Sequence, residues 1–127
     1  MDEDPRGEIT IQALAMPADT NANGDIFGGW LVSQMDLAAG ILAKKISKGR
    51  AVTVAINSMS FLRPVHVGDL ISCHVKLLKI GNTSMDIAVE VWTENLATGN
   101  KSCVTKGTFI FVAIDENGKS RKIQRQE

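Results

Sequence analysis

The chain has 127 residues, with 14 basic and 14 acidic side chains, so its formal net charge at pH 7 is zero. This length predicts a single domain over residues 1–127, and the balanced charge gives no basic field that would attract nucleic acid. The sequence contains no apolar run of 18 residues, so it predicts no membrane span. Its acidic start, MDEDPRGE, is unlike a signal peptide. We therefore expect a cytoplasmic protein with neither nucleic-acid nor membrane partners.

The first predicted elements are a strand over residues 9–15, a polar loop, and a helix over residues 28–47. Apolar residues recur at helical spacing after Gly28, and Gly49 is expected to end the helix. We expect this helix to be buried on several faces, because its apolar residues wrap around more than one side: Trp30, Leu31, Met35, Leu37, Ala38, Ile41, Leu42 and Ile46.

Four further strands are predicted over residues 52–62, 69–79, 84–94 and 102–114. The turn residues Gly81-Asn82 and Thr98-Gly99-Asn100 indicate hairpins, so the sheet should be largely antiparallel. One helix beside about five long strands predicts an α+β fold in which a curved sheet wraps around the helix. The last dozen residues are the one segment expected to be disordered.

The junction NANGDIFGGWLVSQMD, residues 21–36, is the most informative stretch for function. Gly28 and Gly29 open the helix, where the unpaired amides of the first turn could receive a carbonyl oxygen. Asp36 follows about 10 Å further along the axis, among small and apolar residues, and could either activate a water or attack a carbonyl itself. Asn21 could orient a water or the substrate, or could serve only the loop.

These residues resemble the hotdog-fold acyl-CoA thioesterases, most closely the bacterial YciA-like group. The resemblance rests on AMPADTNANGDIFGGWLVSQMD at 15–36, FLRPVHVGD at 61–69 and VAIDENGKSRKI at 112–123, and it covers a core of about residues 9–123. It implies a hotdog fold and a hydrolase that cleaves acyl-CoA to free fatty acid and coenzyme A without a cofactor. In that family the helix carboxylate, here Asp36, is catalytic, and the loop asparagine, here Asn21, is its partner.

The resemblance also implies an assembly and a substrate path. The minimal unit would be a homodimer and the full assembly a hexamer, a trimer of dimers, with Asp36 of one chain facing Asn21 of its neighbour. Phosphates of coenzyme A call for basic side chains, and the candidates are Arg63, Arg121 and Lys122, for which ordinary surface charge is the alternative. The acyl chain would pass Trp30, Met59 and Phe61, each of which could equally be a core residue.

Two other functions stay open. A hotdog dehydratase or hydratase would need a histidine near the helix start, but no histidine precedes His66. A non-catalytic acyl-CoA-binding module would have no need for an ionised Asp36 in an apolar setting. Neither histidine lies in a metal-ligand pattern, and Cys73 and Cys103 fall in apolar strand-like stretches without C-x-x-C spacing, so we expect buried free thiols and no metal site.

Overall fold

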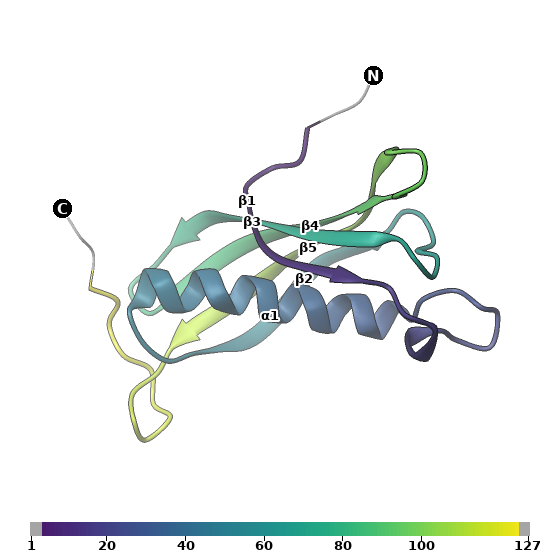
Figure 1. Ribbon diagram of the computed structural model, residues 1–127. Coiled ribbons are helices and arrows are strands. Elements are labelled where there is room, and N and C mark those ends of the chain that lie inside the picture. The colour runs from purple at the N-terminus through teal and green to yellow at the C-terminus, as the bar shows by residue number, and fades with distance from the viewer. Residues whose placement is uncertain (1–3, 125–127) are drawn as a thin grey trace.

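The computed structural model describes residues 4–124, in which a five-stranded sheet carries one long helix across one face (Figure 1). Every predicted strand and the helix are present, and no predicted boundary differs by more than one residue. A short 3-10 turn before the helix was not predicted. The elements are β1 (Glu8–Leu14), η1 (Pro17–Asp19), α1 (Gly28–Ser47), β2 (Ala51–Phe61), β3 (Leu70–Ile80), β4 (Ser84–Glu94) and β5 (Lys101–Ala113).

The strands pair in the order β1-β3-β4-β5-β2, and all neighbours are antiparallel. The hairpins β3–β4 and β4–β5 form the centre of the sheet, and β1 and β2 are its edges. The predicted α+β architecture, a curved antiparallel sheet around one helix, is confirmed. Within residues 4–124 the backbone of β2 has no strand partner on its outer side, so this edge is free to pair with another chain.

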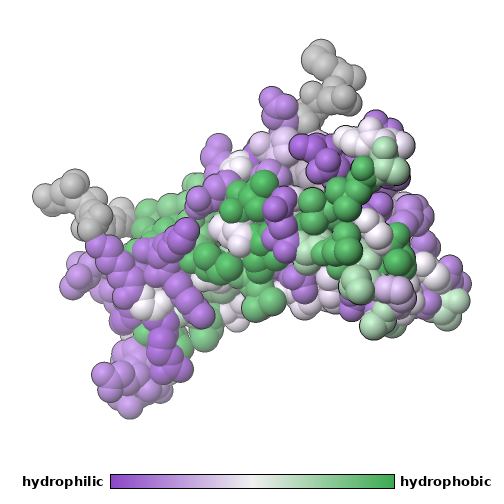
Figure 2. All heavy atoms as spheres, viewed as in Figure 1, coloured by the Kyte–Doolittle hydropathy of each residue, from purple (hydrophilic) through white to green (hydrophobic). Residues whose placement is uncertain are grey.

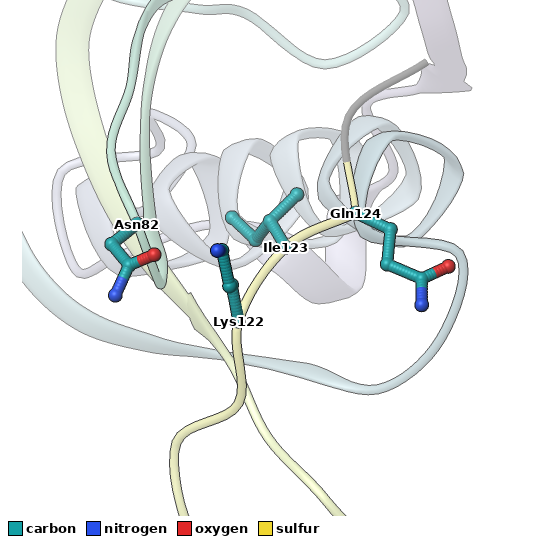
Figure 3. A pocket seen from close by; sticks show the side chains of 4 residues that line it. All are labelled: Asn82, Lys122, Ile123 and Gln124. Carbon is teal, nitrogen blue, oxygen red and sulfur yellow. The ribbon is translucent and has the colours of Figure 1, made fainter.

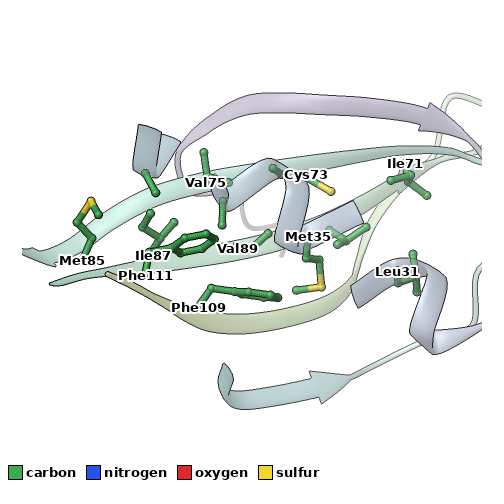
Figure 4. Close-up of a cluster of buried hydrophobic side chains, with 14 of the residues drawn as sticks. Leu31, Met35, Ile71, Cys73, Val75, Met85, Ile87, Val89, Phe109 and Phe111 are labelled. Carbon is green, nitrogen blue, oxygen red and sulfur yellow. The ribbon is translucent and has the colours of Figure 1, made fainter. Parts of the chain in front are cut away.

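The core lies between α1 and the face of the sheet that the helix covers (Figure 4). The alternation predicted for β4 is confirmed, since Met85, Ile87, Val89 and Val91 are all buried and face the helix layer. Small side chains on α1 let the sheet approach the helix closely. These are Ala38, Ala39 and Ala43, each fully buried.

The expectation that α1 is buried on several faces is wrong for its outer side. Leu37 is 59% exposed and Ile41 is 37% exposed, because the sheet of one chain reaches only one side of the helix. Figure 2 shows apolar residues gathered on the face along which α1 runs, beside a strongly hydrophilic loop after β5. An uncovered apolar helix face of this kind marks an interaction surface.

The end of the chain also differs from expectation, because residues 121–124 return to the body of the protein after a loop that projects from it (Figure 1). The backbone amide of Ile123 donates to the carbonyl of Asn82 at 2.9 Å, and the Ile123 side chain is buried. The prediction of disorder was therefore wrong for residues 116–124. It also covered residues 125–127, which lie outside the described residues.

The end of α1 is built differently from the prediction too. Lys48, not Gly49, adopts the left-handed conformation that ends the helix, with φ of 56°. Gly49 is needed for space, because a Cβ there would lie 2.7 Å from Nη2 of Arg121.

Candidate active site

The loop before α1 is held by backbone hydrogen bonds to two neighbouring segments. The amide of Ile26 donates to the carbonyl of Val65 at 3.0 Å, and the amide of Phe27 donates to the carbonyl of Asp19 at 2.9 Å. Residues 63–69, which contain the R-P-x-x-x-G-D pattern, form the turn that carries Val65, and Gly68 at φ of 94° allows that turn to close. The turn at residues 63–69, which carries the R-P-x-x-x-G-D pattern, therefore helps to position the loop before α1, which carries residues 21–27.

The N-terminus of α1 is open. The amide of Leu31 makes the first intrahelical bond, to the carbonyl of Phe27 at 3.2 Å, so the preceding amides of Gly28 and Gly29 have no partner within residues 4–124. A Cβ on Gly29 would meet no atom within 4 Å, whereas one on Gly28 would lie 3.3 Å from the Phe61 ring. The open amides and the helix dipole favour an oxygen with negative charge at this end.

Three of the predicted site residues meet at this helix end, where they line a hollow of about 360 Å³. They are Gly28, Phe61 and Arg63. Phe61 is 54% exposed and forms a wall of the hollow, so it is not a core residue. Arg63 is exposed, and its Nη1 donates to the carbonyl of Cys103 at the end of the sheet. The remaining lining residues are Asp25, Ile26, Leu31, Leu62, Pro64 and Val65.

Asp36 is half-buried on the side of α1 that faces β2. Its Oδ1 accepts a hydrogen bond from Oγ1 of Thr53, an inward-facing residue of β2. Sequence reasoning missed Thr53. The available signal was a hydroxyl between two alanines, Ala51 and Ala55, at the inward positions of a strand that otherwise carries Val and Ile outward.

Asn21 is a loop residue in this chain. Its Oδ1 accepts from the backbone amides of Asn23 at 2.8 Å and Asp25 at 3.2 Å, which closes a tight turn. The side-chain NH₂ has no partner within the described residues, so it is the part of Asn21 that can still donate to a water or a substrate oxygen.

The catalytic groups predicted for one site do not converge within a single chain. Gly28 and Asp36 are eight residues apart on one straight helix, about 12 Å along its axis, whereas a reacting carbonyl and its attacking group must come within about 3.5 Å. A single chain therefore holds the two halves of a site apart.

The C-terminal basic residues lie at the other end of α1. The guanidinium of Arg121 donates to the carbonyls of Ile114 at 2.8 Å, Ser47 at 3.1 Å and Arg50 at 3.2 Å. It thereby binds the helix end to the last strand. Lys122 is exposed and lines a hollow of about 730 Å³ with Asn82, Ile123 and Gln124 (Figure 3). The full length of α1, about 30 Å, separates this hollow from the one at Gly28.

The other two predicted acyl contacts, Trp30 and Met59, are half-buried and pack against the core. Cys73 and Cys103 are buried free thiols, as predicted. Burial raises the pKa of Cys73 to about 12, and burial, followed by the charge of Glu90, raises the pKa of Cys103. Both thiols are therefore protonated at neutral pH, which argues against a cysteine nucleophile.

Neither a cluster of metal-ligand side chains nor a membrane-spanning helix is found in the described part of the chain. Within residues 4–124, no three His, Cys, Asp or Glu side chains are grouped in a way that could hold a metal ion. The helices in this range include none with the length and apolar character needed to cross a membrane.

Comparison with known proteins gives concordant matches. A family model described as "Thioesterase superfamily" matches residues 23–100. The acyl-CoA thioester hydrolase YciA of Salmonella typhimurium is 52% identical over 129 residues, which is 99% of this chain and 97% of that protein.

Two solved structures are similar over most of their length. An aspartate-to-alanine mutant of a hexameric broad specificity acyl-coenzyme A thioesterase matches with a TM-score of 0.93 and 51% identity, covering 96% of this chain and 90% of that one. A hexameric hotdog fold thioesterase of Campylobacter jejuni matches with a TM-score of 0.86 and 41% identity, covering 93% and 91%.

Proposed function

Since the chain belongs to the thioesterase superfamily, and within it to the YciA-type acyl-CoA thioester hydrolases, we propose that it hydrolyses acyl-CoA to a free fatty acid and coenzyme A. The observation that carries the proposal is the carboxylate of Asp36, half-buried on the helix and oriented by the hydroxyl of Thr53. A non-catalytic binding protein would gain nothing from placing a charge there, where burial costs free energy.

In the proposed reaction the oxygen of water bonds to the thioester carbonyl carbon, the C–S bond breaks, and the departing thiolate takes up a proton. The amides of Gly28 and Gly29 hold the oxyanion, and one such donor typically lowers the barrier by about 3–4 kcal/mol. Asp36 acts as general base toward water or as the nucleophile; both routes need its charge. Water is the only co-reactant, so no cofactor is required.

The separation of about 12 Å between Gly28 and Asp36 along one helix supports a dimer. If a two-fold axis passes between two α1 helices at the level of Val32, the helices run antiparallel, and the Gly28 end of one lies level with Asp36 of the other. The NH₂ of Asn21, in the loop before the same helix end, then faces the partner's carboxylate. Two equal sites per dimer result.

The surfaces left open in one chain are suited to this arrangement. The outer face of α1 presents Leu37 and Ile41, and the edge strand β2 presents Val52, Val54 and Ile56, which are 41%, 55% and 43% exposed. A second copy would cover both surfaces and would satisfy the β2 edge. Because the two solved structures compared above are hexameric, we extend the proposal to a hexamer, a trimer of dimers, acting in the cytoplasm.

The same antiparallel arrangement places the basic residues on one side of the site. Arg63 lies at the hollow of its own chain. With the two-fold axis at the level of Val32, the C-terminal end of the partner's helix projects about 16 Å beyond Gly28, so the partner subunit's Arg121 and the partner subunit's Lys122 would lie beyond the hollow in that direction. These three side chains are the proposed contacts for the phosphates of coenzyme A. Trp30, Met59 and Phe61 are the proposed contacts for the acyl chain.

The test is Asp36→Asn, which keeps the size of the side chain and removes its charge. We expect turnover of the best acyl-CoA substrate to fall at least about a hundredfold, since a positioned base contributes that much or more. Release of free thiol from a panel of acyl-CoAs is the measurement, and Asp86→Asn, on the outer face of β4, is the matched control. Near wild-type turnover by the Asp36 variant would show that this carboxylate is structural.

A further inference from the structure

A layer of flexible side chains lies directly behind the hollow at Gly28. On β2, Met59 is the next inward-facing residue after Phe61, and on α1, Met35 is one turn after Leu31. Figure 4 shows Leu31 and Met35 following one another along the helix and pointing toward the sheet. Neither methionine lines the hollow itself, but each follows a lining residue toward the core, Met35 after Leu31 and Met59 next to Phe61.

On the sheet side of this layer, the residue that faces the two methionines is a glycine. Gly107 is buried on β5, opposite Val89 of β4. A Cβ at this position would lie 2.8 Å from Cε and 3.0 Å from Sδ of Met59, and 3.5 Å from Cε of Met35. The Met59 thioether thus occupies the space that a side chain of β5 would otherwise fill, which explains a glycine in a strand interior.

Two properties of the layer distinguish it from ordinary core. Methionine has three rotatable bonds and adapts its shape easily, unlike the branched and aromatic residues that fill most of the sheet face. In addition, Oγ1 of Thr105, two residues before Gly107, is fully buried and has no hydrogen-bond partner within the described residues. An orphan hydroxyl is unusual in a closed core, and water that enters beside it would satisfy it, whereas the hydrocarbon of an acyl chain would not.

We propose that Met59, seated over Gly107, is the movable end wall of the acyl pocket and determines which acyl chain lengths are hydrolysed fastest. The inference rests on the proposed function and assigns a specificity role within the same site. A short acyl chain leaves Met59 in place. A longer acyl chain displaces the Met59 thioether, and the space above Gly107 limits how far the acyl chain can then extend.

The experiment measures kcat and KM for straight-chain acyl-CoAs from acetyl to palmitoyl, by release of free thiol. Met59→Ala removes three heavy atoms, so we expect the preferred acyl chain to lengthen by about two to four carbons, with kcat/KM rising about fourfold for each extra methylene accommodated. Gly107→Ala forces Met59 toward the hollow, so we expect the preferred chain to shorten.

A double mutant separates this role from a general effect on the fold. In the Met59→Ala background, Gly107→Ala should leave the chain-length preference unchanged, because the side chain through which it acts is gone. The matched control is Met85→Leu, which should keep the wild-type preference. Met85 is also fully buried, but it lies on β4 four residues before Val89, the residue opposite Gly107. Met59→Leu provides a milder variant if Met59→Ala does not fold.

The outcomes distinguish this inference from the function on which it rests. If wild type and all variants hydrolyse acyl-CoA with one chain-length preference, the role of Met59 is overturned and the function stands. An equal shift by Gly107→Ala in both backgrounds also overturns it, because the effect would not pass through Met59. If the wild-type protein releases no thiol from any acyl-CoA, the proposed function fails together with this inference.

Discussion

A carboxylate is useful on a half-buried helix face only if its orientation is controlled. Asp36 receives that control from Thr53, whose hydroxyl donates to one carboxylate oxygen while the other has no partner within the described residues. A hydrogen bond to a charged group is worth about 1.5–3 kcal/mol, enough to select one rotamer of the carboxylate. Thr53 is therefore a positioning residue for Asp36.

Replacing Thr53 tests that role. We expect Thr53→Val, which keeps the shape and removes the donor, to lower kcat about ten- to a hundredfold with little change in KM. Thr53→Ser should recover most of the activity. Thr10→Val is the control, because Thr10 also donates to α1, at 2.9 Å to the carbonyl of Ala38, but does not contact Asp36. Equal losses in the Thr10 and Thr53 variants would indicate a general effect on helix packing.

The two ends of α1 are treated in opposite ways. At the N-terminus the amides of Gly28 and Gly29 are open, while at the C-terminus Arg121 binds three carbonyls around the helix end. A cation at this end is favourable, because the last carbonyls of a helix carry partial negative charge. The open end is available for the proposed chemistry, and the contacts of Arg121 stabilise the closed end.

This difference separates the two arginines proposed to bind coenzyme A. We expect Arg121→Ala to lower the free energy of unfolding by about 2 kcal/mol, and Arg63→Ala, an exposed side chain with one carbonyl contact, by less than about 1 kcal/mol. Urea unfolding measures both. Arg63→Ala should also raise KM for acyl-CoA more than it lowers kcat, since remote phosphate contacts are mostly uniform binding.

A substrate that lacks the nucleotide provides the control for this prediction. On a short pantetheine thioester, Arg63→Ala should match the wild-type protein. An equal loss on both substrates would place Arg63 in the fold or in the chemical step and exclude a role at the nucleotide end.

The chain as a whole has the surfaces of half an assembly. One side of α1 and the β2 edge carry exposed apolar side chains, and the two halves of the proposed site stand about 12 Å apart on one helix. The isologous pairing proposed above would account for both facts, because it would cover the apolar surface and bring Gly28 of one chain level with Asp36 of the other.

Subunit mixing tests the pairing. Asn21→Ala and Asp36→Ala proteins, each weak or inactive alone, should complement when their subunits exchange. A mixed dimer holds one site with both native residues and one with neither, so roughly a quarter of all sites should be restored after random exchange. Tag pull-down confirms exchange. No recovery after confirmed exchange would mean that Asn21 and Asp36 act within one chain, or that Asn21 serves only its loop.

The elements, their order and the candidate carboxylate could be predicted from local patterns. Alternation in β4 and helical spacing after Gly28 depend on neighbours along the chain, and these local preferences agree with the final fold. Asp36 could be singled out because a charge among apolar residues conflicts with the pattern around it.

Other features depend on contacts between residues far apart in the sequence, which no local pattern encodes. Thr53 contacts Asp36 only because β2 lies along one side of α1, and Arg121 contacts the end of α1 because the chain after β5 returns there. Leu37 is exposed because one sheet covers one side of a helix. Tertiary structure decided these three cases, since each depends on which surfaces the completed sheet reaches and which it leaves uncovered.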